Sequence, residues 1–321
     1  MKHTFLLLLP TVLLAACGST QSFSSAPASF PAQTTDLKIA SPFGAPSVAL
    51  YPFLKNSSAN IEGTSGANIG SFLGPNSVKD IVIAPTNAGV AAIKTKSAPF
   101  KLAGTVTFGN FFLAATGNDE NKQLDPDDYV VAFQKGQVPD KIFSYVYDNL
   151  TNVHYIESEA VTPASTLIKG VDEERENAKV DYVLIAEPAL TTALSKQPKA
   201  SIYSSLQEKY AEKSGGKTIM QASIFVNNSA DKTKVQSFLD GVKSGVEAFL
   251  AEPSVIDEHL SSMSVEDQKA TFTASAENLK AMTKNGNRMG LGYKDAYANK
   301  ESIASFLGLW NMSIDEEVYY K

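Results

Sequence analysis

The segments DIVIAPTNAG, Asp80 to Gly89, and DYVLIAEPALTTAL, Asp181 to Leu194, decide the fold. Each opens with a short apolar run that is continuous rather than alternating, as is typical of a strand buried on both faces of a parallel sheet. Helical spacing follows the first run from Thr86 to Lys96. The two segments therefore predict βα units of an α/β protein, with right-handed crossovers.

Outward from the first segment, strands and helices alternate. Before an acidic, turn-rich break at 117–128, we predict strands at 37–41, 60–63, 80–84 and 101–115 and helices at 45–55 and 86–96. After the break, we predict strands at 129–133, 153–157 and 182–186 and helices at 140–150 and 163–179. A strand-like run then spans 217–227, and the rest is helical by its spacing, beginning near Asp231.

This order predicts two α/β lobes, with the second inserted into the first. We assign 36–115 and 222–321 to lobe 1 and 116–221 to lobe 2, with hinges near 114–117 and 220–223. Each lobe is predicted to be a mostly parallel sheet flanked by helices, and two lobes joined by two segments form a hinged cleft.

Composition excludes several classes of protein. The chain has 321 residues, of which 43% are hydrophobic and 19% charged, so it supports a sizeable core and is not a disordered polymer. A net charge of −6 without an Arg-rich stripe argues against nucleic-acid binding. The single cysteine excludes a disulfide framework and thiolate metal clusters.

That cysteine, Cys17, lies at the end of an export signal. Lys2 precedes an apolar run from Phe5 to Ala16 that is too short to remain a membrane-spanning helix. Leu14-Ala15-Ala16-Cys17 resembles the lipobox of bacterial lipoproteins, which implies removal of residues 1–16 and acylation of Cys17, including palmitate. An ordinary signal with an incidental cysteine is the alternative. Residues 17–35 are rich in Ser, Ala and Pro and are expected to form a flexible tether.

Together with the lipobox, the two opening segments and SLQEKYAEKSGGKTIMQASIFV at 205–226 resemble the type II solute-binding lipoproteins of ABC importers, in the branch for nitrate, sulfonate, taurine and thiamine precursors. The resemblance implies the two-lobe periplasmic-binding-protein type II fold. It also implies a monomer on the extracytoplasmic face of the membrane that captures a small molecule and delivers it to an ABC permease, with neither catalysis nor a cofactor.

In lobe 1, the candidate ligand-binding residues follow strands, because ligands of open α/β sheets bind beyond the carboxyl ends of the strands. Gly44 would let backbone approach a ligand and Phe43 would stack on it, although a plain turn explains both. Thr86 and Asn87 fit either the ligand or a helix cap. The candidates in this lobe are Ser41, Phe43, Gly44, Ala45, Thr86, Asn87, Phe108 and Asn110.

In lobe 2, Gln134, Gly136 and Gln137 precede a helix that starts near Pro139, so their backbone amides are expected to face the ligand. Glu187 directly follows a buried strand. Its carboxylate would bind an amine, an amidine-like ring edge or a sugar hydroxyl, or would only mark the start of a helix.

The mature chain has two arginines, Arg175 and Arg288, and we expect Arg175 to lie on a solvated helix face. Because anion sites favour bidentate arginine, a strongly anionic ligand is disfavoured unless Arg288, backbone amides or Lys135 bind it. A neutral or weakly cationic heterocycle, such as a thiamine precursor, fits the residues better.

Catalysis finds no support in the motifs. His154 and His259 lack metal-ligand spacing, and no phosphate-binding loop is present. Asp125, Asp127 and Asp128 lack the glycine and final glutamate of a calcium loop. We therefore expect a binding protein. The alternatives are a surface lipoprotein that uses the same fold for adhesion and an enzyme-like protein of the thiamine-precursor pathway.

Overall fold

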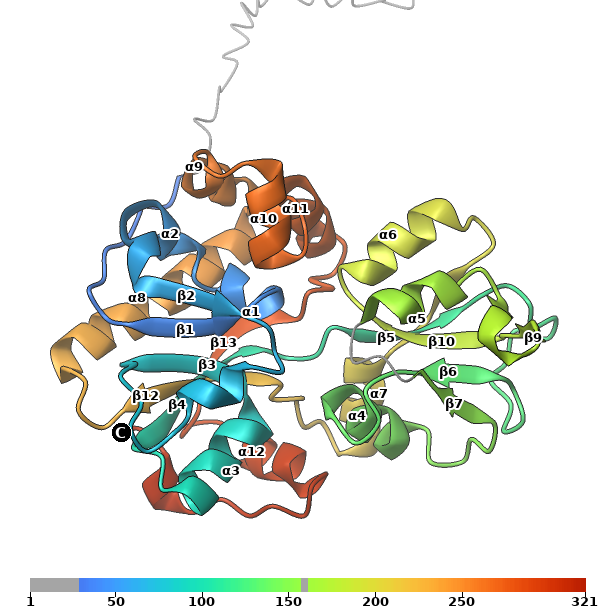
Figure 1. Ribbon diagram of the computed structural model, residues 1–321, viewed down its shortest axis with the longest axis horizontal. Coiled ribbons are helices and arrows are strands. Elements are labelled where there is room, and N and C mark those ends of the chain that lie inside the picture. Colours follow the sequence, from blue (N-terminus) through green and yellow to red (C-terminus); the bar gives the residue numbers. More distant parts are fainter. Residues whose placement is uncertain (1–28, 157–160) are drawn as a thin grey trace, which may run out of the picture.

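The computed structural model describes residues 29–156 and 161–321, and it contains two α/β lobes (Figure 1). The predicted signal peptide at 1–16, the lipidated Cys17 and most of the tether at 17–35 lie outside the described residues. The lobes are joined by a first crossing segment, 108–110, and a second crossing segment, 214–221. Lobe 1 comes before the first and after the second, and lobe 2 lies between them.

Lobe 1 has a six-stranded sheet in the order β13-β4-β12-β3-β1-β2. β1 runs parallel to β2 and β3, whereas β12 is antiparallel to β3 and β4, and β13 is antiparallel to β4. Its strands are β1 (Ile39–Pro42), β2 (Ile61–Thr64), β3 (Ile81–Pro85), β4 (Phe100–Thr107), β12 (Ala222–Asn227) and β13 (Leu291–Asp295).

Helices cover both faces of this sheet, with α3 and α12 on one face and the other helices on the opposite one (Figure 1). The long helix α8 begins after Asp231, whose carboxylate accepts the N–H of Lys234 as an N-cap. The helices are α1 (Ala45–Val48), α2 (Tyr51–Ser57), α3 (Thr86–Lys96), α8 (Lys232–Ala251), α9 (Ile256–Leu260), α10 (Val265–Phe272), α11 (Ala276–Lys284) and α12 (Lys300–Gly308), with 3₁₀ turns at Ser58–Asn60, Ile69–Phe72, Pro253–Val255 and Glu316–Val318.

Lobe 2 has a five-stranded sheet in the order β11-β5-β10-β6-β7, with α5 and α6 on one face and α4 and α7 on the other (Figure 1). β10 runs parallel to β6 and antiparallel to β5. The elements are β5 (Phe111–Ala115), β6 (Val130–Ala132), α4 (Val138–Val146), β7 (Val153–Tyr155), α5 (Val161–Leu167), β10 (Tyr182–Ala186), α6 (Ala189–Lys196), β11 (Ser201–Ser205) and α7 (Leu206–Lys213), with a small hairpin of β8 (Val171–Asp172) and β9 (Ala178–Lys179) around a 3₁₀ turn at Glu173–Arg175.

The strand registers show which sheet edges meet at the crossing segments. Pro85 at the end of β3 and Thr107 at the end of β4 both pair with Ala222, where β12 begins. Ala186 at the end of β10 pairs with Phe111, where β5 begins. Because β1 is parallel to β3 and β6 is parallel to β10, the carboxyl ends of all four strands meet the crossing segments. We call the crossing segments, together with the loops after these strands at 43–44, 86–87, 133–137 and 187–188, the junction.

The two-lobe α/β architecture is confirmed, but several details differ from the sequence-based expectations. Both sheets are mixed rather than mostly parallel. The predicted strand 101–115 is two strands in different sheets, because Phe108 gives its backbone N–H to Gly290 and Gly109 has a φ of 99°. The first crossing therefore precedes 114–117, and residues 111–115 belong to lobe 2 rather than lobe 1. The second crossing, expected at 220–223, spans 214–221.

The predicted helix at 163–179 is also wrong beyond its first turns. Helix α5 ends at Leu167, Gly170 has a φ of 89°, and Glu176 and Asn177 also have positive φ values, which turn the chain into the β8–β9 hairpin. Arg175 therefore does not lie on a solvated helix face. Its guanidinium pairs with the buried carboxylate of Asp172 at 2.7 Å.

The apolar core has two parts. One lies between the lobe 1 sheet and the helices α1, α2 and α8–α11. The other extends from the opposite face of that sheet through the crossing residues Ile219 and Met220 into lobe 2. Among the described residues, no helix is both long and apolar enough to cross a membrane.

Candidate functional site

The polar groups of the loop after β1 bond mainly to other residues of lobe 1. Ser41 is fully buried, and its Oγ accepts a hydrogen bond of 3.2 Å from Ser47 Oγ. Gly44 has a φ of 94° and donates its N–H to the carbonyl of Thr271 at 2.9 Å. Ala45 is buried. The polar groups of Ser41 and Gly44 are thus committed within lobe 1.

Two phenylalanines of the junction rest on glycines. The ring of Phe43 is 43% exposed and covers Gly63, where an added Cβ would lie 2.5 Å from a ring carbon. The half-buried ring of Phe108 covers Gly292 in the same way, and the ammonium of Lys294 lies 5.4 Å from its centre. Phe43 therefore presents open aromatic surface, whereas one face of Phe108 is packed and the ring already has a cation nearby.

Hydroxyl groups connect β3, β4 and β12 near the loop after β3. Thr86 Oγ1 lies 2.6 Å from Ser223 Oγ, which lies 2.8 Å from Thr105 Oγ1. The N–H of Thr86 is donated to the carbonyl of Gln221. The side-chain oxygen of Asn87, the next residue, is buried without a hydrogen-bond partner among the described residues. The hydroxyl and N–H of Thr86 are therefore both hydrogen bonded within lobe 1 and the second crossing, whereas the side-chain oxygen of Asn87 is not hydrogen bonded within the described chain.

A relay of amides links the two crossing segments to lobe 2. Asn110 donates from Nδ2 to the carbonyl of Glu187 at 2.9 Å and accepts from Gln221 Nε2 at 3.2 Å. The N–H of Glu187 is in turn donated to the carbonyl of Asn110. Asn110 is 8% exposed. The predicted candidate Asn110 thus lies at the junction, where it holds the first crossing against the loop after β10.

The loop after β6 turns through Gln134 and Gly136, which both have positive φ. The N–H of Gly136 is donated to Asp140 Oδ2 at 2.6 Å, and that of Gln137 to the carbonyl of Gln134. Gln137 is exposed at the N-cap of α4. The backbone amides of Gly136 and Gln137, which we predicted to face a ligand, are hydrogen bonded within the loop.

Asp140, which the sequence analysis did not select, organises this loop. Its carboxylate is buried and also accepts from Ser144 Oγ at 2.9 Å and from the Tyr155 hydroxyl at 2.5 Å. Burial, together with the hydrogen bond to Asp140, raises the pKa of Tyr155 to about 12. All of these contacts are inside lobe 2.

Glu187 is bound by groups from both lobes. Its side chain is fully buried and accepts from the backbone N–H of Thr191 at 3.0 Å and from the Thr191 hydroxyl at 2.9 Å. From lobe 1, Arg288 places Nε 3.1 Å from Glu187 Oε1, and its guanidinium also donates to Thr191 Oγ1 at 2.8 Å. The carboxylate that we expected to meet a ligand is therefore paired with the arginine that we considered for an anion.

Arg288 is carried by a tight loop at 285–290, between α11 and β13. Asn287, at a φ of 52°, uses its side chain to bind both the N–H and the carbonyl of Leu291. Gly290 has a φ of 59° and accepts the N–H of Phe108, and an added Cβ there would lie 2.3 Å from a backbone oxygen of the first crossing segment. The loop is therefore fitted closely against the crossing segment, which places Arg288 at lobe 2.

Unpartnered polar atoms gather at the junction and directly beside it. Among the described residues, six buried side-chain nitrogen or oxygen atoms make no hydrogen bond, and four of these belong to Asn87, Thr107, Gln221 and Arg288. The Arg288 atom is Nε, which is ion-paired with Glu187 but not aligned for a hydrogen bond. Thr107 and Gln221 were not among the predicted site residues. They lie inside the predicted strand runs 101–115 and 217–227 rather than at a strand end, so the sequence carried no signal for them.

No group of three or more His, Cys, Asp or Glu residues suited to a metal ion occurs in 29–156 or 161–321. His154 stacks on Tyr129 with a centroid distance of 4.1 Å, and His259 is buried against Tyr51. Asp128 accepts the N–H of Asp125 and so closes a turn.

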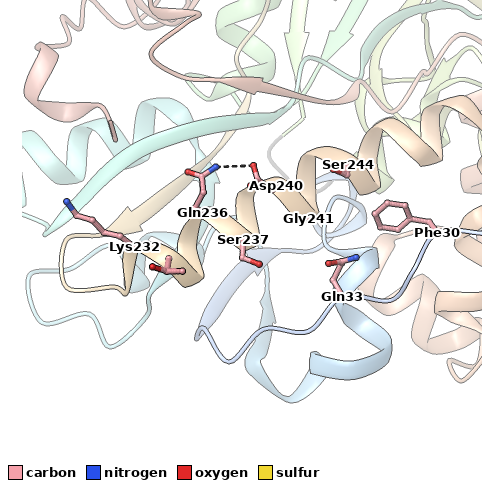
Figure 2. A pocket seen from close by; sticks show the side chains of 9 residues that line it. Phe30, Gln33, Lys232, Gln236, Ser237, Asp240, Gly241 and Ser244 are labelled. Atoms are coloured by element: carbon pink, nitrogen blue, oxygen red, sulfur yellow. Dashed lines mark hydrogen bonds between the residues drawn. The ribbon is translucent and has the colours of Figure 1, made fainter.

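A groove of about 740 Å³ lies away from the junction, along the outer side of α8 beside the segment of Phe30 and Gln33 (Figure 2). Its lining is mostly exposed polar side chains, among which Gln236 donates to Asp240 at 3.0 Å. The groove is open and belongs to lobe 1 alone, so it is not the meeting point of the strand ends.

No protein-family profile matches the chain, and no curated protein sequence matches it. Solved structures do match. An ABC transporter protein from Parabacteroides distasonis is 18% identical, with a TM-score of 0.69 over 90% of this chain and 99% of that one. The periplasmic aliphatic sulphonate binding protein SsuA from Escherichia coli is 13% identical, with a TM-score of 0.58 over 88% and 90% of the two chains.

The ligand-binding component of an ABC-type import system from Staphylococcus aureus, solved with zinc bound, is 10% identical, with a TM-score of 0.59 over 90% of this chain and 97% of that one. At these identities the similarity concerns the fold. The chain therefore has the two-lobe, periplasmic-binding-protein-like fold that the sequence predicted.

Proposed function

We propose that this protein is the extracytoplasmic solute-binding component of an ABC importer and acts without catalysis. The observation that carries the proposal is the junction, where two short crossing segments join two α/β lobes and the carboxyl ends of β1, β3, β6 and β10 meet. Ligands of open α/β sheets bind at such strand ends, and two-segment connections allow hinged closure. The solved structures of similar fold, two of which are named as solute- or ligand-binding proteins, support it.

The proposal includes a lipid anchor at Cys17. Its support is the sequence Leu14-Ala15-Ala16-Cys17 after a short apolar run. Expressed in a bacterium with radiolabelled palmitate, the chain should incorporate label, and Cys17→Ser should abolish it. Incorporation that is unchanged in Cys17→Ser would contradict the anchor.

In this proposal a monomer captures a small molecule, for which a neutral or weakly cationic heterocycle such as a thiamine precursor remains the expectation, and delivers it to an ABC permease. Capture would occur by a population shift toward the closed arrangement of the lobes, driven by tighter binding to that state.

The test is thermal unfolding and small-angle X-ray scattering of the full chain in detergent micelles with thiamine precursors, nucleobases, sulfonates, nitrate, amino acids and polyamines. A bound solute in excess of its dissociation constant should raise the melting temperature by several degrees, because it stabilises the folded state by about 3 kcal/mol. It should also reduce the radius of gyration.

Two glutamines provide a matched pair of variants. Gln221→Ala at the junction should weaken the ligand-induced shift, whereas Gln236→Ala on the outer side of α8 should leave it unchanged. A well-folded chain that responds to no chemical class would contradict solute capture.

A further inference from the structure

The buried ion pair at the junction is already complete. Glu187 and Arg288 form an ion pair across the lobes, and both Glu187 oxygens are engaged by Thr191 as well. The ammonium of Lys294 is hydrogen bonded to Thr218 Oγ1 at 3.1 Å. Breaking a buried ion pair leaves an uncompensated charge and is strongly unfavourable, so a charged solute gains nothing by displacing either partner.

The hydrogen-bond relay fixes which way the Gln221 amide points. Because the acceptor on Glu187 is a backbone carbonyl, Asn110 must present its nitrogen to it and its oxygen to Gln221. Gln221 must then present its own nitrogen to Asn110. Its remaining oxygen, Oε1, is therefore an acceptor by necessity, and it is buried without a partner in the described chain.

Asn87 Oδ1 and Thr107 Oγ1 are also buried without a partner in the described chain and lie on neighbouring segments, and the Thr107 hydroxyl can donate as well as accept. The carbonyl of Gln221 accepts the N–H of Thr86, the residue next to Asn87. The N–H of Gln221 is donated to the carbonyl of Thr107. Thr107 is 1% exposed. A buried polar atom that finds no partner costs about 1–3 kcal/mol, so three such atoms on adjoining segments favour a ligand that forms hydrogen bonds with them.

We infer that the solute is uncharged, donates N–H groups to Gln221 Oε1 and Asn87 Oδ1, and forms a hydrogen bond with the Thr107 hydroxyl. This inference rests on the proposed function and names the class of solute for the same junction. Sulfonates and nitrate carry only acceptors, so they would leave Gln221 Oε1 and Asn87 Oδ1 unpaired, and a quaternary ammonium has no hydrogen to donate. An amide, a lactam or a nucleobase-like ring fits.

Isothermal titration calorimetry and thermal unfolding of the full chain in micelles test the inference. The probes are uracil, cytosine and nicotinamide, with 1,3-dimethyluracil as the same ring without N–H groups, and methanesulfonate and tetramethylammonium as charged probes. We expect at least one of the N–H probes to bind, and 1,3-dimethyluracil and both charged probes not to bind.

Two threonines of the same strand give matched variants. Thr107→Val removes a hydroxyl that the fold leaves unpaired, so it should leave the melting temperature unchanged or raise it while weakening binding of the N–H probe about 3- to 10-fold. Thr105→Val removes a hydroxyl that bonds Ser223, so it should lower the melting temperature and keep the affinity within about twofold.

The outcomes separate the two proposals. Binding of methanesulfonate or tetramethylammonium without binding of an N–H probe would overturn the solute class and leave solute capture standing. Unchanged affinity in Thr107→Val would overturn the assignment of its hydroxyl. If no probe binds to a well-folded chain, the inference fails. If the wider panel above also gives no response, the proposed function fails with it.

Discussion

Two buried carboxylates, Asp140 and Glu187, occupy comparable places in lobe 2 but are satisfied in different ways. Asp140 is in the first turn of the helix after β6, and Glu187 directly follows β10. Every described partner of Asp140 belongs to lobe 2, whereas Glu187 shares its oxygens between Thr191 of lobe 2 and Arg288 of lobe 1.

The two buried carboxylates, although they lie near neighbouring strand ends, therefore perform different tasks. The Asp140 contacts hold the loop 134–140 in shape regardless of lobe 1. The Glu187–Arg288 contact exists only while the lobes are together, so its free energy favours the closed arrangement. Variants that separate stability from lobe closure should tell the two apart.

The largest effect is expected from Arg288→Met. The substitution leaves the Glu187 carboxylate buried without its cation, so the free energy of unfolding should fall by about 3 kcal/mol and the radius of gyration should increase as the lobes part. Urea denaturation and small-angle scattering measure the two. The double variant Glu187→Gln with Arg288→Met should recover more than half of the loss, and equal losses in both would contradict the pairing.

Asp140→Ala should have a somewhat smaller effect, confined to lobe 2. It removes the acceptor of Gly136, Ser144 and Tyr155, which should lower the free energy of unfolding by about 2 kcal/mol without changing the radius of gyration. The control Ser144→Ala removes one of these contacts and should cost about 1 kcal/mol. A change in radius for Asp140→Ala would mean that this loop also governs closure.

The smallest effect is a pH dependence carried by Tyr155, whose pKa of about 12 in the folded chain exceeds the usual value of 10. The neutral phenol is favoured by folding, so its contribution is complete below about pH 10 and is lost as pH rises toward about 12. Wild type should exceed Tyr155→Phe in stability by about 1 kcal/mol at neutral pH, and the gap should close over that window. Denaturation at several pH values checks it, and a constant gap would contradict it.

The elements that were predicted well are those whose pattern is local. β3 and β10 are continuous apolar runs, and α3 follows helical spacing from Thr86 to Lys96. β11 was missed because it is an edge strand with little burial and therefore lacks an apolar pattern. The charges of 163–179 fit a helix, whereas the positive φ values at Glu176 and Asn177 that end it depend on the folded context.

For the junction, the sequence indicated loops at the ends of the strands but not the contacts within them. Asn87, Asn110 and Glu187 do lie at the junction. Arg288 meets Thr191 across 97 positions of sequence, and no local pattern encodes such a distant contact. The orphan oxygens of Thr107 and Gln221 are likewise visible only after all nearby donors have been assigned.

The strand order of lobe 1 also bears on the order in which the two lobes fold during translation. β12 lies between β3 and β4, yet it is made only after all of lobe 2. During translation, lobe 2 is complete once α7 has left the ribosome, while the older sheet still has an open slot at its centre. We therefore expect lobe 2 to fold first. The sheet of lobe 1 is then completed when β12, which is synthesised later, inserts between β3 and β4.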